Sequence, residues 1–227
     1  MSDDGPLDLP APTRDGGTGP GVFIAFEGGE GAGKSTQVRL LCDWLTAGGR
    51  AARATFEPGG TPAGAAVRAI VLDRAHTGLA ARAEALLYAA DRAQHAAAVL
   101  RPALAAGEVV VSDRYIDSSL AYQGAGRTIP LDDVSAISRW ATEGLRPHLT
   151  VLLDLPPETG LARARGRAEA DRLESESLEF HQRVRATFRT LAGGDPDRYL
   201  VLDATRPVDE IAAGVRARVA ALLEAGA

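Results

Sequence analysis

Eight consecutive residues near the start of the chain, Gly28 to Ser35, fit the spacing G-x-x-x-x-G-K-[ST]. Glycines let the backbone bend so that successive N–H groups surround a phosphate, at a helix N-terminus whose partial positive charge favours an anion. Lys34 would then reach the outer phosphates, and the Ser35 hydroxyl would ligate Mg²⁺. The predicted phosphate loop consists of Gly28, Gly29, Glu30, Gly31, Ala32, Gly33, Lys34, Ser35 and Thr36.

The residues on both sides of this loop supply the context that the pattern requires. Val22 to Phe26 is an apolar run with β-branched and aromatic residues, which is typical of a buried strand. From Gln37 to Leu45 the apolar residues follow helical spacing. The alternative is a chance glycine turn, but such a turn would require neither a strand before it nor a helix after it. The order strand, loop, helix favours phosphate binding.

Polar residues follow another apolar run, residues 109–112, where a further strand is expected to end. Asp113 is placed to hold Mg²⁺ or its waters, and Arg114 could bind a phosphate through two hydrogen bonds. If a helix begins here, Ser118 and Tyr122 lie on the same face as Arg114. An Asp–Arg pair that only caps the helix is the alternative. The strand end favours a function, because ligands of open parallel sheets bind there.

Tyr88 and Arg92 are four residues apart in an alanine-rich stretch that predicts a helix, so they share one face. An aromatic ring beside a fork of hydrogen-bond donors could recognise a nucleotide base. Taken singly, a tyrosine is more often part of the core and an arginine is more often solvated. The pair is therefore a hypothesis for base binding.

Two loop regions carry weaker signals. Residues 57–62, Glu-Pro-Gly-Gly-Thr-Pro, exclude a helix until Thr61-Pro62, and taken alone they indicate a turn more than a site. Arg163 and Arg167 share a helical face with Arg165 beside them, before a charged run at residues 171–174. That region is either a solvated helix end or a flap that brings arginines onto a polyphosphate.

The composition limits the class of protein. A chain of 227 residues fits one domain of ordinary α/β size. The formal net charge of −5 argues against nucleic acid or an anionic membrane as a partner. Cys42 is the single cysteine, so no internal disulfide can form, which suits a reducing cytoplasm. No apolar run approaches the length of a membrane span.

Strand and helix patterns alternate along the chain, which predicts an α/β fold with a five-stranded parallel sheet flanked by helices. The expected strands are residues 22–26, 51–56, 109–112, 149–155 and 199–202. The expected helices are residues 37–45, 62–73, 80–105, 131–145, 157–167, 174–192 and 207–225. Residues 1–21 are rich in Pro, Gly and Asp and predict a disordered tail.

Five sequence blocks stand in the order and at the spacing of one family. They are FEGGEGAGKST at 26–36, EPGGT at 57–61, AEALLYAADRAQH at 83–95, SDRYIDSSLAYQGAGR at 112–127 and RARGRAEADRLE at 163–174. Through these blocks the chain closely resembles the bacterial thymidylate kinases, the dTMP kinases among the P-loop nucleoside-monophosphate kinases. The resemblance implies a kinase domain over residues 22–227, with a P-loop NTPase fold, a monophosphate-binding region and a lid at about 163–174.

The resemblance also implies a reaction: ATP with Mg²⁺ phosphorylates dTMP to dTDP for DNA-precursor synthesis, in a cytoplasmic homodimer. The residues it implies for the dTMP site are Glu57, Pro58, Tyr88, Arg92, Arg114, Ser118, Ser119 and Tyr122. The catalytic residues it implies are Lys34, Arg114, lid Arg167 and Glu30. Ser35 and Asp113 are the implied metal ligands, and the resemblance implies that Arg163 lies over the adenine of ATP.

Two positions place the chain within the family. Some members carry a catalytic arginine inside the phosphate loop, whereas this chain has Glu30-Gly31-Ala32 there and keeps its arginines in the lid, as in the enteric-bacterial type. Most members have an arginine before the EPGGT block, where this chain has Phe56. The role of that arginine cannot be carried over to this chain.

The implied chemistry needs no general base. The nucleophile is a phosphate oxygen of dTMP, and because the second pKa of such a monoester is about 6, it is ionised at neutral pH. The histidines are therefore expected to be structural or exposed. Arginine only donates hydrogen bonds, so Arg92 could bond thymine O4 but would face the amino group of cytosine.

Other functions remain open at the level of sequence. The chain could be another monophosphate kinase or a deoxynucleoside kinase of similar fold. A GTP-driven switch usually carries an Asn-Lys-x-Asp segment, which is absent here. A catalytically inactive relative is disfavoured, because Lys34, Ser35, Asp113, Arg114 and the lid arginines are all present.

Overall fold

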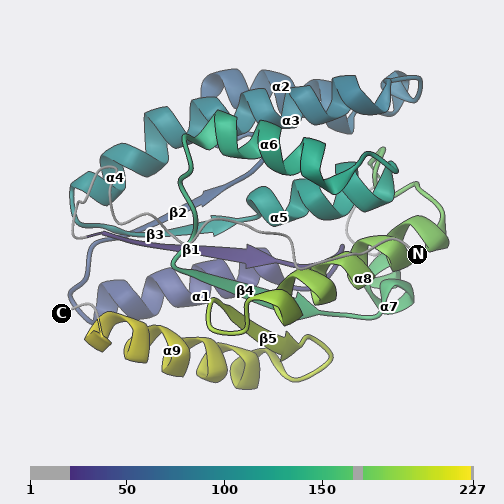
Figure 1. Ribbon diagram of the computed structural model, residues 1–227. Coiled ribbons are helices and arrows are strands. Elements are labelled where there is room, and N and C mark those ends of the chain that lie inside the picture. The colour runs from purple at the N-terminus through teal and green to yellow at the C-terminus, as the bar shows by residue number, and fades with distance from the viewer. Residues whose placement is uncertain (1–20, 166–170, 226–227) are drawn as a thin grey trace.

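The computed structural model describes residues 21–165 and 171–225, and these residues form the α/β fold that the sequence predicts. One sheet of five parallel strands has the order β2-β3-β1-β4-β5 (Figure 1). The strands are β1 Val22–Glu27, β2 Ala52–Phe56, β3 Val109–Asp113, β4 Leu149–Asp154 and β5 Tyr199–Asp203. Every expected strand is confirmed, and each differs from its predicted range by one residue at one end.

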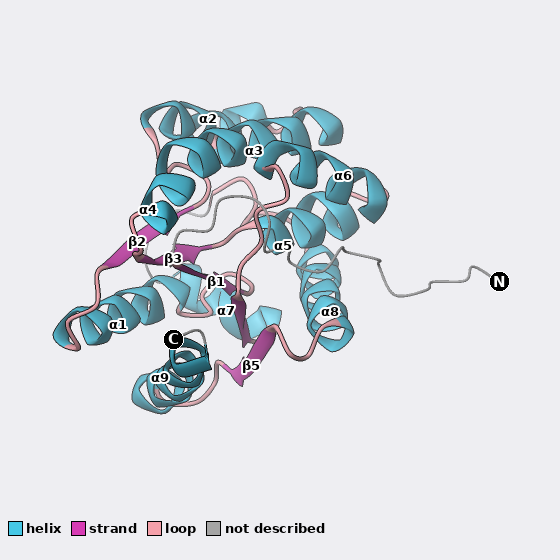
Figure 2. Cartoon of the chain, turned by 60° about the vertical axis from the view of Figure 1, so that its left-hand side comes forward, coloured by secondary structure: helices cyan, strands magenta, loops and turns pink. Residues whose placement is uncertain are grey.

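Helices cover both faces of the sheet. They are α1 Lys34–Ala47, α2 Pro62–Leu72, α3 Ala81–His95, α4 Arg101–Ala105, α5 Ile116–Ser119, α6 Leu131–Thr142, α7 Pro157–Arg165, α8 Leu178–Gly194 and α9 Val208–Ala225. Figure 2 shows α1 and α9 on one face, with α3, α4, α5 and α6 on the other and α2 lying outside α3. This arrangement explains why the central strands are nearly continuous apolar runs, since both of their faces are buried.

Several predicted helices differ from the structure at their ends; for example, the helix predicted over 131–145 ends at Thr142. Two further differences have local reasons. Residues 81–105 are helical as expected, but a π-helical turn, Ala96–Leu100, separates α3 from α4, where Pro102 lacks the N–H of a regular helix. The helix expected from residue 174 begins only at Leu178. Asp171 accepts the backbone N–H groups of Leu173 and Glu174 in a turn, and the Ser177 side chain caps α8.

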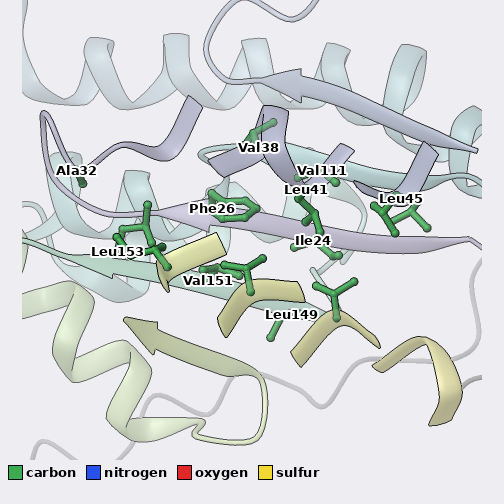
Figure 3. Packing of buried hydrophobic residues seen from close by; sticks show 14 of the residues in the cluster. Ile24, Phe26, Ala32, Val38, Leu41, Leu45, Val111, Leu149, Val151 and Leu153 are labelled. Carbon is green, nitrogen blue, oxygen red and sulfur yellow. The ribbon is translucent and has the colours of Figure 1, made fainter. Parts of the chain in front are cut away.

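The largest core cluster lies between the sheet and the α1/α9 layer. Ile24 and Phe26 of β1 pack there with Val38, Leu41 and Leu45 of α1, all at most 5 % exposed (Figure 3). Because side chains alternate along a strand, Phe23 and Ala25 lie on the opposite face of β1, in a second cluster.

The sheet positions the site through its strand ends. Phe26 is in register with Asp113 on β3 and Phe56 is in register with the same Asp113, so β1, β2 and β3 end side by side. The loops after these strands are therefore neighbours, as expected for an open parallel sheet. No helix within residues 21–165 and 171–225 is both long and apolar enough to cross a membrane.

Candidate active site

The phosphate loop joins β1 to the N-terminus of α1, in the context that the sequence predicts. Gly28, Gly31 and Gly33 have positive φ angles of 139°, 64° and 91°, which side chains rarely adopt. A Cβ atom at Gly31 would also lie 2.3 Å from the carbonyl oxygen of Gly160 on α7. Glycine at this position therefore serves both the turn and the close approach of α7.

Lys34 lies inside the curve of this loop. Its Nζ donates to the carbonyl oxygens of Gly28 at 3.0 Å and Gly29 at 2.8 Å, and the residue is buried. Burial lowers the pKa of Lys34, and the neighbouring positive charge of Arg114 lowers it further. A polyphosphate in the loop would add negative charge and favour the charged ammonium form of Lys34.

The two predicted metal ligands meet across the strand ends. Ser35 at the start of α1 donates from Oγ to Oδ2 of Asp113, which ends β3, at 2.5 Å. A hydroxyl and a carboxylate are hard oxygen donors, the kind that Mg²⁺ takes together with nucleotide phosphates and water. Within the described residues no group of three His, Cys, Asp or Glu residues could hold a metal by itself. This donor set fits a metal that arrives with a nucleotide.

Arg114 connects the phosphate loop with Ser118 and Tyr122, which follow β3. One guanidinium nitrogen donates to the Gly28 carbonyl at 3.2 Å and to Ser118 Oγ at 3.1 Å. The other donates to Glu30 Oε1 at 2.8 Å and to the Tyr122 hydroxyl at 3.3 Å. Arg114 therefore contacts Ser118 and Tyr122 as the sequence suggested, but it precedes α5 and does not share a helix face with them.

Glu30 in the loop is held as a carboxylate. Its Oε1 accepts hydrogen bonds from Arg114 and from the Tyr122 hydroxyl, the latter at 2.7 Å. Burial acts to raise the pKa of Glu30, but the charges of Arg114 and Lys34 outweigh it and bring the pKa to about 2. Glu30 is thus fully ionised at neutral pH and offsets the positive charges of Arg114 and Lys34.

A cavity of about 170 Å³ opens between α3 and α5, and the predicted base-binding pair lines it. Tyr88 and Arg92 come from α3, facing Ser118, Ser119 and Tyr122 from the segment after β3. Glu57 and Pro58 line the same cavity, although their sequence alone indicated only a turn. All eight residues implied for the dTMP site are therefore brought together here.

Arg92 is the most constrained of these residues, because its side chain is buried within a network. Its Nε donates to Glu57 Oε2 at 2.8 Å, and Glu57 Oε1 lies 2.8 Å from His95 Nδ1. One terminal nitrogen donates to Ser119 Oγ at 3.0 Å and to the Tyr115 carbonyl at 3.2 Å. Glu57 thus fixes the orientation of Arg92, a role that the sequence pattern did not indicate.

A second cavity, of about 820 Å³, opens beside the phosphate loop. Lys34, Ser35 and Asp113 line it, and it shares Glu30 and Arg114 with the smaller cavity. A triphosphate-sized space and a base-sized space therefore adjoin at the Arg114 guanidinium.

Sequence reasoning missed several residues that line the small cavity, Arg68 and Gln123 among them. Arg68 of α2 lines both cavities and donates to the Pro58 carbonyl at 2.8 Å, with its guanidinium 5.8 Å from the Phe56 ring centroid. No motif in the sequence marked Arg68 as a site residue, because its place in the cavity depends on how α2 packs. Gln123 also lines the small cavity, and its amide donates to Glu84 at 2.9 Å.

The predicted lid is only partly described. Arg163 is exposed on α7, next to the phosphate loop, and donates to the Ala204 carbonyl at 3.1 Å. Arg167, the predicted catalytic arginine, lies outside the described residues. Arg172, near the end of the predicted lid segment, is buried; it donates to the Val71 carbonyl and pairs with Glu84 at 2.7 Å.

A central strand that ends in a phosphate loop, with a second pocket sharing Arg114, defines a P-loop nucleotide kinase. The sequence model of the thymidylate kinase family matches residues 26–215. The chain is 58 % identical over 201 residues to the thymidylate kinase of Leifsonia xyli, covering 88 % of this chain and 95 % of that protein. It is 55 % identical over 199 residues to that of Deinococcus radiodurans, covering 88 % and 96 %. The chain belongs to the thymidylate kinase family.

The Glu30–Arg114 contact predicts a stability difference at acid pH. Because the pKa of Glu30 falls from an ordinary 4.5 to about 2 in the folded chain, its stabilising effect is complete above pH 4.5. That effect is lost as the pH falls toward 2. In thermal unfolding, Glu30→Gln should be less stable than wild type at pH 6, and the gap should shrink between pH 4.5 and 2. Glu224→Gln, on the surface of α9, controls for removal of a carboxylate; a gap independent of pH would contradict the assignment.

Proposed function

We propose that this kinase transfers the terminal phosphate of ATP to dTMP, giving ADP and dTDP, and that Mg²⁺ accompanies the donor. The observation that carries the proposal is the meeting of the two cavities at Arg114 and Glu30, next to Lys34. The donor triphosphate fits the cavity at the phosphate loop, and the acceptor base fits the cavity at Tyr88. The acceptor phosphate would then lie at the Arg114 guanidinium.

The protein's part in this reaction is alignment and neutralisation of charge, because phosphoryl transfer needs little covalent participation. Arg114 would bind the acceptor phosphate in exchange for its present contact with Glu30. Lys34 would leave the loop carbonyls for the β- and γ-phosphates. Mg²⁺, held by Ser35 and by Asp113 directly or through water, would neutralise charge on the transferred group.

The acceptor site has a physical basis for selecting thymine. The Arg92 guanidinium can only donate, so it suits thymine O4 and opposes the amino group of cytosine. Its orientation is fixed by Glu57, which keeps it from turning away from an incorrect base. Tyr88 would stack on the ring, and Tyr122 would press on the sugar where a 2′-hydroxyl would stand. Ser118 and Ser119 would complete the edge contacts.

Further assignments rest on the family and belong to the same proposal. Residues 163–174 act as the lid, with Arg163 over the adenine and Arg167 on the transferred phosphate. Residues 22–227 form the kinase unit, which works as a homodimer in the cytoplasm and serves DNA-precursor synthesis. Neither nucleic acid nor a membrane is expected as a partner, given the formal net charge of −5.

The acceptor preference tests this proposal directly. In coupled ADP-release assays with dTMP, dUMP, dCMP, dGMP and dAMP, we expect dTMP to have the highest kcat/KM. Arg92→Ala should lower the dTMP-to-dCMP ratio about tenfold or more, because an unpaired buried donor costs about 1–3 kcal/mol. Arg82→Ala, an exposed arginine on the same helix, should leave the ratio unchanged. An unaltered ratio in folded Arg92→Ala would refute the base-reading role, and equal turnover of all acceptors would refute the substrate.

A second prediction concerns the lid. Arg167→Ala should lower kcat by about 10³-fold or more, as expected for an arginine that stabilises transferred charge, with the KM for dTMP within about twofold. Arg50→Ala, at an exposed position after α1, is the matched control. Steady-state kinetics in which only the KM for dTMP rises would assign Arg167 to ground-state binding instead.

A further inference from the structure

Glu27, the last residue of β1, carries a fully buried carboxyl group that the reaction described above does not use. It shares a strand face with Phe23 and Ala25, which pack in an apolar cluster. A buried carboxylate is costly unless hydrogen bonds satisfy it. The described residues include no cation within ion-pair distance of Glu27, so its partners must be neutral donors.

Those donors all come from the start of the segment after β3. Glu27 Oε1 accepts the backbone N–H of Tyr115 at 2.8 Å and that of Ser118 at 3.2 Å. Ser118 Oγ donates to the second carboxylate oxygen at 2.6 Å. Tyr115 and Ser118 are the cap and third positions of α5, and the Tyr115 side chain makes no capping hydrogen bond to the helix. In a capping box, side chains within the helix itself accept these two N–H groups. Here a side chain of β1, Glu27, accepts them instead.

The segment that Glu27 holds carries the acceptor-phosphate contacts. Arg114, directly before the cap, has a φ of 72°, a left-handed conformation that costs a non-glycine residue about 1–3 kcal/mol. Its backbone N–H donates to the Phe26 carbonyl at 2.9 Å, so β1 holds both sides of this turn. The Ser118 hydroxyl that donates to Glu27 also accepts from the Arg114 guanidinium at 3.1 Å.

We propose that Glu27 is a positioning residue of the acceptor site, which fixes the Arg114 guanidinium through Ser118 and the N-terminus of α5. The proposal rests on the proposed function only for the identity of the acceptor. The phosphate loop follows β1 directly, and Glu27, the last side chain of β1, holds the start of α5. The donor and acceptor subsites thereby share one rigid support.

The glutamine variant is a close mimic of the native side chain. Burial raises the pKa of Glu27 to about 8, with the charge of Asp117 adding to the shift and the Ser118 hydrogen bond opposing it. Glu27→Gln keeps the oxygen that accepts both backbone N–H groups, and the Ser118 hydroxyl can rotate to accept from the new amide. Glu27→Asp withdraws the carboxylate by one methylene, and Glu27→Ala removes it.

Steady-state kinetics and hydrogen exchange on the full chain test the proposal. For Glu27→Asp and Glu27→Ala we expect the KM for dTMP to rise tenfold or more, with the KM for ATP within twofold. Glu27→Gln should stay within about threefold of wild type for both. Amide exchange across residues 115–126 should accelerate in Glu27→Asp and not in Glu27→Gln, while exchange in α1 stays unchanged.

Each outcome bears on one claim. If Glu27→Ala fails to fold, Glu27→Asp decides. A folded Glu27→Asp with unchanged exchange at residues 115–126, or with equal rises in both KM values, would overturn the positioning role. If wild type does not phosphorylate dTMP, the proposed function fails, but the hydrogen-exchange comparison still tests whether Glu27 holds residues 115–126 in place.

Discussion

The contact between the Arg114 guanidinium and the phosphate loop is the interaction on which the site depends. Arg114 donates to the Gly28 carbonyl and to Glu30 on one side, and to Ser118 and Tyr122 on the other. Because the same guanidinium borders both cavities, its position sets the distance between donor and acceptor. Alignment of this kind is the main contribution that a protein can make to phosphoryl transfer.

Keeping that guanidinium in place requires polar side chains in an otherwise apolar sheet. Glu27 and Glu57 both end or follow strands, and both are buried, yet each accepts hydrogen bonds from the wall of the acceptor pocket. Removing one partner from such a network leaves the other unpaired in the interior, which is strongly destabilising. These hydrogen bonds therefore hold the acceptor wall in place, whereas the contacts of Glu30, Arg114, Lys34 and the Ser35–Asp113 pair are the ones that nucleotide and metal binding would exchange.

The sequence was sufficient to predict the sheet, the phosphate loop and the residues that gather at the strand ends. These follow from local patterns: apolar runs, glycine spacing and the position of polar residues after each strand. It was insufficient for contacts between distant residues. Nothing in the spacing of Glu57 and Arg92, 35 residues apart, indicates that one fixes the other. The left-handed conformation of Arg114 and the contribution of Arg68 likewise depend on the packing of separate elements.

Calorimetric binding of dTMP and thymidine to wild type and Arg114→Met measures the central contact most directly, because the two ligands differ only in the phosphate. A hydrogen bond to a charged group is worth about 1.5–3 kcal/mol, so wild type should bind dTMP at least about tenfold more tightly than thymidine. In Arg114→Met the two Kd values should come within about threefold. Retention of the full wild-type preference in folded Arg114→Met would contradict the account.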